Sequence, residues 1–368
     1  MKILILSCNT GEGHNSAANA VAELMRPKGH ECHIRDALAY LSRGVSSFIC
    51  NWHVRIYRNI PFAFNIGYRL CEKGQNGKDR SVVMSFLKGG TDKLYAEIKE
   101  GDYDFVLSTH PFSAYMYTNV KKKHGVNIRS GFIATDYVCC PPVDKTDIDC
   151  YFIPHESLKA DFTARFVPEE RLYGTGLPVR PEFYKKYPKA VVKRALDLPD
   201  GKDNVLLMCG SMGCGPLKEL AVSLSKALPD SAHLTVICGS NKRLKKSLDD
   251  HGFERGNVRV LGYTKNVHYY MDSAEFIITK AGGITCTESM VKGLPMVLVN
   301  AIGGCESYNR DFFTAKGGAV IAEGDVAELA VKLLSSKKKL KAMSAAMNAL
   351  YMGNAAENIC DIICGKER

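Results

Sequence analysis

The chain has 368 residues, 46% of them hydrophobic, and a formal net charge of +10. A chain of this length and composition can bury a large core and is long enough for two domains. No apolar run approaches the roughly 18 residues that a membrane-spanning helix needs, so none is expected. The positive charge favours an anionic partner such as a nucleotide, a nucleic acid or a membrane surface.

Short apolar runs alternate with helical patterns along the whole chain, which predicts an α/β protein with parallel sheets. The first run is followed directly by Gly11 to His14, which is typical of a first buried strand and not of a signal peptide. The predicted strands cover residues 3–7, 105–108, 129–133 and 150–153 in the first half, and 205–209, 234–238, 258–261, 276–279 and 296–299 in the second.

The two glycines and two prolines of residues 174–181 are typical of a hinge, which we place at residues 176–181 between two doubly wound domains. We expect the domains at residues 1–175 and 182–350, and a C-terminal helix within 351–368 that packs back on the first domain. Fourteen cysteines are scattered without any C-x-x-C pair or zinc-like spacing. We therefore expect a cytoplasmic chain with reduced, mostly buried thiols and no disulfide framework.

The stretch from Arg43 to Lys93 is poor in predicted strands and rich in aromatic and basic residues. It holds nine Lys or Arg and three acidic residues. Three interpretations fit this pattern: a membrane-docking surface, single-stranded nucleic-acid binding, or a pair of amphipathic helices with a solvated basic face. We favour the membrane surface and expect no nucleic-acid partner. The residues expected to insert are Trp52, Phe62 and Phe64, and those expected to contact headgroups are Arg55, Arg58 and Arg69.

Three glycine-bearing turns follow predicted strands: Thr10 to His14, Gly210 to Gly215 and Lys280 to Thr285. None matches a Walker motif or the dinucleotide fingerprint, and each could simply be a tight turn. A glycine turn that opens a helix also presents backbone N–H groups to an anion, and three of them favour a bound diphosphate.

Two further features could recognise a nucleoside. Glu288, one turn into the helix after the third glycine turn, could accept hydrogen bonds from both ribose hydroxyls. A surface acid near a helix N-terminus is the alternative, because the helix dipole favours it. Gly262 and Tyr263 end a predicted strand, where backbone groups could contact a base.

Taken in order, these motifs resemble the diacylglycerol glycosyltransferases of glycosyltransferase family 28, which include bacterial processive diacylglycerol glucosyltransferases and plant monogalactosyldiacylglycerol synthases. The resemblance extends from residue 1 to about residue 355. It is carried by Gly11-x-Gly13-His14, Thr109-His110-Pro111, Thr135-Asp136, Gly176 to Pro181, Leu261-Gly262-Tyr263, Lys280 to Glu288, and Glu306 with Asn309.

The resemblance implies a GT-B fold, with two Rossmann-like doubly wound domains that face each other across a cleft. It implies an inverting hexosyltransferase that uses UDP-glucose or UDP-galactose as donor and diacylglycerol as acceptor. It also implies a peripheral position on the anionic inner face of the cell membrane. Two rivals are an epimerase acting on UDP-N-acetylglucosamine and a non-catalytic UDP-sugar sensor. The sequence leaves the oligomeric state open.

The resemblance assigns roles residue by residue. His14 is the general base or a sugar and phosphate contact, and Asp136 is the reserve base or the group that orients His14. The expected substrate-binding residues are Gly13, His110, Arg180, Gly210, Ser211, Gly262, Tyr263, Ala281, Gly282, Gly283, Ile284, Thr285, Glu288, Glu306 and Asn309.

No cofactor or metal ion is expected, because helix dipoles can neutralise the phosphates. The triplet Asp147-Ile148-Asp149 has the D-x-D form of metal-dependent transferases, but it lies in a polar loop far from the donor turns. One departure from the family concerns Cys305, which stands where the family usually has a glutamine expected to touch sugar hydroxyls. The sugar that is transferred is therefore left open.

Overall fold

The computed structural model describes residues 1–9, 12–41, 82–299 and 303–366. The residues expected to meet a membrane, from Trp52 to Arg69, lie outside these ranges. The chain forms two compact units. The first contains Met1–Arg180, Ile302–Cys305 and Met352–Arg368, and the second contains Pro181–Ala301 and Glu306–Tyr351.

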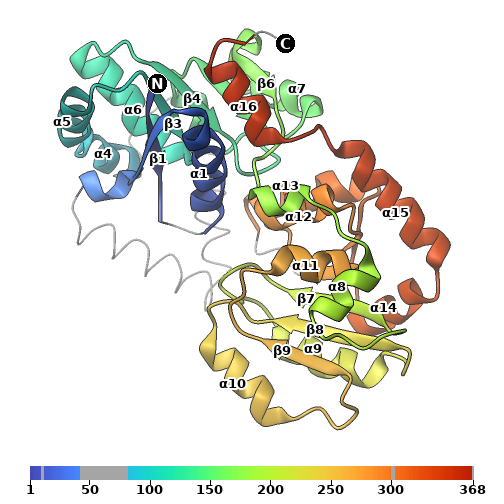
Figure 1. Ribbon diagram of the computed structural model, residues 1–368. Helices are drawn as coiled ribbons and strands as arrows, with labels where there is room; N and C mark the ends of the chain where they lie inside the picture. The colour runs from blue at the N-terminus through green and yellow to red at the C-terminus, as the bar shows by residue number, and fades with distance from the viewer. Residues whose placement is uncertain (10–11, 42–81, 300–302, 367–368) are drawn as a thin grey trace. The chain divides into compact units, whose positions relative to one another are not determined.

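The first unit is built on a six-stranded parallel sheet with the order β2-β1-β3-β4-β5-β6 (Figure 1). Its strands are β1 (Lys2–Ser7), β2 (Glu31–Asp36), β3 (Phe105–Ser108), β4 (Arg129–Ile133), β5 (Cys150–Ile153) and β6 (Leu172–Gly174). Its α-helices are α1 (Glu12–Met25), α4 (Val82–Lys88), α5 (Thr91–Gly101), α6 (Pro111–His124), α7 (Lys159–Thr163) and α16 (Ala355–Ile363). The central strands β1 and β3 are apolar and buried on both faces, as expected for parallel strands covered by helices.

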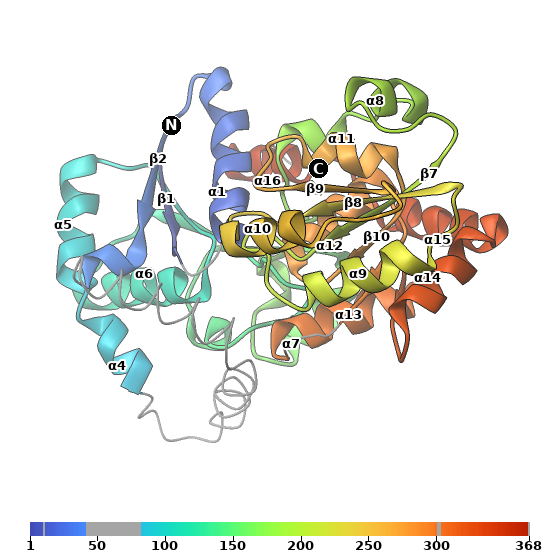
Figure 2. The ribbon, with the colours of Figure 1, turned by 90° about the horizontal axis from the view of Figure 1, so that it is seen from below.

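The C-terminal helix α16 belongs to the first unit, where it packs against α1 (Figure 2). Asn354 caps its N-terminus by accepting a hydrogen bond from the N–H of Ala356. At the other end, Arg129 of β4 donates to the carbonyl oxygens of Ile362 and Ile363. A cation at a helix C-terminus satisfies its last carbonyls and complements its dipole, so β4 directly anchors this helix.

The second unit repeats the architecture with the strand order β12-β11-β10-β7-β8-β9. Its strands are β7 (Asp203–Met208), β8 (Ala232–Ile237), β9 (Val258–Leu261), β10 (Ala274–Thr279), β11 (Met296–Leu298) and β12 (Ala319–Ile321). Its α-helices are α8 (Lys189–Ala195), α9 (Leu217–Ala227), α10 (Lys242–His251), α11 (Val267–Ser273), α12 (Gly283–Lys292), α13 (Cys305–Ala315), α14 (Val326–Leu334) and α15 (Lys337–Leu350). Helix α13 begins at Cys305, the last residue of its segment in the first unit.

An apolar core covers one face of the second sheet. Val205 and Ile278 of the strands pack with Leu224 of α9 and Leu333 of α14. Helices α9 and α14 lie side by side over this face (Figure 2). The expectation of two doubly wound α/β domains is confirmed, and each predicted strand exists with its ends shifted by at most two residues. Strands β2, β6 and β12 were not predicted.

One buried histidine in the second unit should make stability depend on pH. His233 of β8 is 5% exposed, and neither ring nitrogen has a hydrogen-bond partner among the described residues. Burial, reinforced by the positive charges of Arg259, Lys202 and Lys193, lowers its pKa from 6.5 to about 4. Between these pH values the unfolded chain binds a proton that the native state does not, so native stability falls as the pH drops from 6.5 towards 4.

We expect His233→Leu to lose less stability on acidification than the unsubstituted protein, by up to roughly 3 kcal/mol between pH 7 and pH 4. Denaturant unfolding at several pH values measures this difference. His251→Leu, at the exposed end of α10, is the control. The same pH dependence with and without His233 would show that this imidazole is not the acid-sensitive group.

Candidate functional site

Each sheet has one point where the winding direction reverses. In the first unit it lies between β1 and β3, and in the second between β7 and β10. In doubly wound folds, ligands bind at the carboxyl ends of the strands beside this switch point. The residues that follow β1, β3, β7 and β10 are therefore the first candidates for a site in each unit.

His14 lies in the first turn of α1, just after β1, and joins the ends of three strands. Its Nδ1 is 2.7 Å from the carbonyl oxygen of Thr109, which follows β3. The same nitrogen is 3.1 Å from the hydroxyl of Thr135, which follows β4. The His14 and His110 rings meet edge to face, with centroids 4.4 Å apart. Residues from three widely separated stretches of the sequence thus form one cluster at the switch point.

The partner of Nδ1 fixes the chemistry of His14. A carbonyl oxygen only accepts hydrogen bonds, so Nδ1 carries the proton and the lone pair lies on Nε2. Burial lowers the pKa of His14 to about 4, although the hydrogen bond to Thr109 acts in the opposite direction. The imidazole is therefore neutral at pH 7 and can accept a proton at Nε2.

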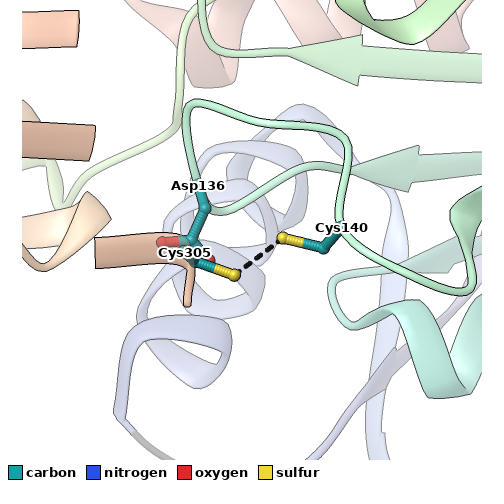
Figure 3. Close-up of side chains that lie close together, drawn as sticks. All are labelled: Asp136, Cys140 and Cys305. Carbon is teal, nitrogen blue, oxygen red and sulfur yellow. Dashed lines mark hydrogen bonds between the residues drawn. The ribbon is translucent and has the colours of Figure 1, made fainter. Parts of the chain in front are cut away.

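His110 and Asp136 extend the cluster. The Nδ1 of His110 accepts a hydrogen bond of 3.0 Å from the N–H of Phe112 and caps α6. Its neutral form therefore carries the proton on Nε2, the opposite tautomer to that of His14. Asp136 follows Thr135 at the end of β4 and is half-buried. Figure 3 shows its carboxyl group beside the thiols of Cys140 and Cys305.

The glycine turn of the second unit lies between β10 and α12. Gly282 occupies the N-cap position of α12, so no side chain caps the helix. A Cβ atom added at Gly282 would meet nothing within 4 Å, which indicates space beside the turn. The first N–H groups of α12, including those of Gly283, Ile284 and Thr285, have no partner within the helix and suit an anion.

Helix α13 holds this turn in place. The ammonium group of Lys280 is 2.6 Å from a carboxylate oxygen of Glu306, and both side chains are largely buried. The side-chain amide of the fully buried Asn309 donates to the carbonyl oxygen of Ala281. Glu306 and Asn309 were expected to bind substrate, and these contacts attach both of them to the turn itself.

Other expected residues lie in different surroundings. Gly210 has a φ of 69°, and a Cβ added there would lie 3.4 Å from Cε of Lys280, so Gly210 and Ser211 adjoin the third glycine turn. Glu288 is only 7% exposed, which removes the interpretation of a surface acid. Gly262 and Tyr263 follow the edge strand β9, and Tyr263 is 67% exposed. Arg180 is the last residue of the first unit before the chain enters the second.

The D-x-D triplet lies at the opposite end of the first sheet, where the parallel strands β4 and β5 begin. Asp149 accepts hydrogen bonds from the backbone N–H and hydroxyl of Ser130, at the start of β4. Asp147 is 2.9 Å from a guanidinium nitrogen of Arg171, and Lys121 approaches both acids. These carboxylates are therefore paired with cations away from the switch point.

Three structural residues of the site were not assigned roles from the sequence. Thr109 acts through its backbone carbonyl, which no side-chain pattern indicates. Thr135 and Lys280 stood inside quoted motifs, and their position directly after a strand was the only signal.

Known proteins match the two units separately and together. The family model for monogalactosyldiacylglycerol synthase matches residues 14–179, and that for the C-terminal domain of glycosyltransferase family 28 matches residues 204–359. Two processive diacylglycerol beta-glucosyltransferases, from Bacillus cereus and Bacillus thuringiensis, are each 29% identical over 373 residues. The alignment covers 98% of this chain and 93% of theirs.

Solved structures show the same fold at low identity. The UDP-GlcNAc 2-epimerase of Neisseria meningitidis superimposes with a TM-score of 0.65 at 15% identity, over 99% of this chain and all of that one. MurG of Acinetobacter baumannii superimposes with a TM-score of 0.65 at 15% sequence identity, over 99% of each chain. The glycotransferase of kitacinnamycin superimposes with a TM-score of 0.67 at 14% sequence identity, over 99% of this chain and 98% of that one. At such identities the likeness shows the fold alone.

The hydrogen bonds of His14 with Thr109 and of His110 with Phe112 predict opposite tautomers for these two neighbouring histidines. We expect nitrogen NMR of histidine-labelled protein at pH 7 to place the proton of His14 on Nδ1 and that of His110 on Nε2. His14 should remain neutral until the pH approaches about 4. His14→Asn assigns the resonance. A His14 signal that titrates near the ordinary value of 6.5 would contradict the assignment of a neutral base.

Proposed function

Because this chain belongs to the diacylglycerol glycosyltransferases of glycosyltransferase family 28, we propose that it transfers a hexose from a UDP-sugar to diacylglycerol at a membrane surface. The relatives that match almost the whole chain are processive diacylglycerol beta-glucosyltransferases. Glycosyl transfer is the shared activity of this family. The UDP-sugar donor, the diacylglycerol acceptor and the membrane surface are what we propose for this chain beyond that activity.

The observation that carries the proposal is the neutral His14 imidazole at the switch point of the first unit. Its Nδ1–H donates to Thr109, which leaves the lone pair of Nε2 to accept a proton. In the proposed reaction, Nε2 takes the proton of the acceptor hydroxyl while that oxygen bonds to the anomeric carbon. The bond from this carbon to the diphosphate breaks, and its electrons leave with UDP. Because the hydroxyl attacks the face opposite the departing diphosphate, the configuration at this carbon inverts. Asp136 is the second candidate for the base.

The donor site is proposed for the second unit. The N–H groups of Gly283, Ile284 and Thr285 and the positive end of the α12 dipole bind the diphosphate. Glu288, one turn further along α12, accepts hydrogen bonds from the ribose hydroxyls. The contacts of Glu306 and Asn309 with Lys280 and Ala281 support this role indirectly, because they fix the turn that carries these N–H groups.

A peripheral position at the anionic inner face of the cell membrane completes the proposal. The described end of the aromatic–basic stretch supports it: Val83 and Phe86 of α4 are 43% and 42% exposed and share one helix face. Lys88 follows them on the same short helix. Among the described residues no helix is long and apolar enough to cross a bilayer.

One assay tests the whole proposal. Purified protein is incubated with labelled UDP-glucose, UDP-galactose or UDP-N-acetylglucosamine, with and without vesicles that contain diacylglycerol and phosphatidylglycerol. We expect a labelled glycolipid from UDP-glucose or UDP-galactose that requires diacylglycerol. Epimerised UDP-N-acetylglucosamine without lipid, or UDP binding without any product, would replace the proposal by the epimerase or the sensor.

We expect His14→Ala to reduce turnover by about 10²–10⁴-fold, because a positioned base typically contributes that much. UDP affinity should change little, since the donor site is assigned to the second unit. Turnover and calorimetric UDP binding are measured on the same preparation, with His251→Ala as control. If Asp136→Asn lowers turnover more than His14→Ala does while UDP binding persists in both, the base is Asp136.

We expect Glu288→Ala to weaken UDP binding by roughly 1.5–3 kcal/mol, the usual cost of losing hydrogen bonds to a charged group. Calorimetry with UDP measures the effect, and circular dichroism verifies the fold of this buried position. Glu219→Ala is a matched control, because Glu219 is an exposed acid in the first turn of α9 in the same unit. Unchanged UDP affinity in a folded Glu288 variant would end the ribose assignment.

A further inference from the structure

A cluster of three potential metal ligands lies in the first unit beside the proposed base. The Sγ atoms of Cys140 and Cys305 are 2.9 Å apart (Figure 3). The ligand atoms of Asp136, Cys140 and Cys305 all lie within 4.8 Å of one another. All three residues are half-buried, which leaves them reachable from solvent. Two sulfur atoms and a carboxylate oxygen form a donor set that suits a thiophilic divalent cation such as Zn²⁺.

The backbone restrains these ligands on both sides. Cys140 precedes Pro141, which restricts its backbone to extended conformations. Its carbonyl oxygen accepts a hydrogen bond from the N–H of Val143, which closes the loop. Cys305 is the first residue of α13 and follows Gly303 and Gly304, both with positive φ. The partial positive charge at the start of a helix favours negative charge there, which suits a thiolate ligand.

We propose that Asp136, Cys140 and Cys305 form a binding site for Zn²⁺ or a similar thiophilic cation. Zinc–sulfur bonds of about 2.3 Å in tetrahedral geometry separate two sulfur ligands by roughly 3.8 Å. The two sulfur atoms are 2.9 Å apart, so they need to move apart by about 0.9 Å to bind zinc. Rotation of the cysteine side chains can supply this movement. Binding releases the two thiol protons to solvent, and the fourth position of a tetrahedral ion remains for water or another ligand.

A disulfide between the two cysteines is the competing chemistry. Forming it would remove two electrons and two protons and so needs an oxidant, which the metal site does not. The carboxylate of Asp136 is a natural part of a metal site and has no place in a disulfide. The metal proposal stands on this geometry and does not depend on the proposed function.

Cobalt is the probe for the test, because thiolate-to-Co²⁺ charge transfer and tetrahedral d–d bands report sulfur ligation directly. The full-length protein is kept reduced without oxygen, titrated with Co²⁺ and then with Zn²⁺. We expect one Co²⁺ per chain, a thiolate charge-transfer band, and displacement by Zn²⁺. Changes around metal ligands alone typically cost about 10–100-fold in affinity, so Cys140→Ser, Cys305→Ser and Asp136→Asn should each cost at least about tenfold.

Cys364→Ser is the matched control, because Cys364 is an exposed thiol of the same unit whose Sγ lies 3.7 Å from Nε2 of His30. It should bind Co²⁺ as the unsubstituted protein does. A charge-transfer band that survives in the Cys140→Ser/Cys305→Ser protein, or disappears in Cys364→Ser, would place the metal elsewhere. Absence of thiolate ligation in the reduced protein would overturn the site. The separate serine variants keep the test decisive should one of them fail to fold.

Discussion

The hydrogen bond from Nδ1–H of His14 to the carbonyl oxygen of Thr109 is the contact on which the site in the first unit depends. It joins the segment after β1 to the segment after β3, the two strands beside the switch point. It also decides the tautomer, and therefore which ring nitrogen can accept a proton. Because the carbonyl belongs to the backbone, the orientation of the imidazole is set by the fold and not by a second titratable side chain. The chemistry of this unit thus follows from the pairing of β1 with β3.

The second unit uses side chains for the corresponding task. The turn that opens α12 is held by the ion pair of Lys280 with Glu306 and by the hydrogen bond from Asn309 to Ala281. A largely buried ion pair contributes little net stability, but removing one partner leaves an uncompensated charge. The pair therefore acts mainly to position the turn. An anion bound at the first N–H groups of α12 would meet a turn that is already ordered, which lowers the entropic cost of binding.

The sequence was informative where burial determines the pattern. Strands β3 and β5 were predicted with their observed ends, because continuous apolar runs mark strands buried on both faces. Strand β2, Glu31–Asp36, escaped because it lies at an edge and carries charged and polar residues, and β6 and β12 have only three residues each. His14, Asp136 and the α12 turn followed from motifs. The contact of His14 with Thr109 could not be predicted, because a backbone carbonyl has no sequence signature. Cys140 and Cys305 are far apart in the sequence, and only the fold brings their thiols together.

Cys305 connects the question of the sugar with the metal cluster. It stands where the family usually has an amide that is expected to touch sugar hydroxyls, and a thiol is a poor substitute as donor or acceptor. Its neighbours cannot simply replace that amide, because Glu306 pairs with Lys280 and Asn309 donates to Ala281. The thiol instead lies against Cys140 and Asp136. The position that the resemblance assigns to the sugar thus holds a thiol of the proposed metal site, and we expect sugar selectivity in this chain to depend on other groups.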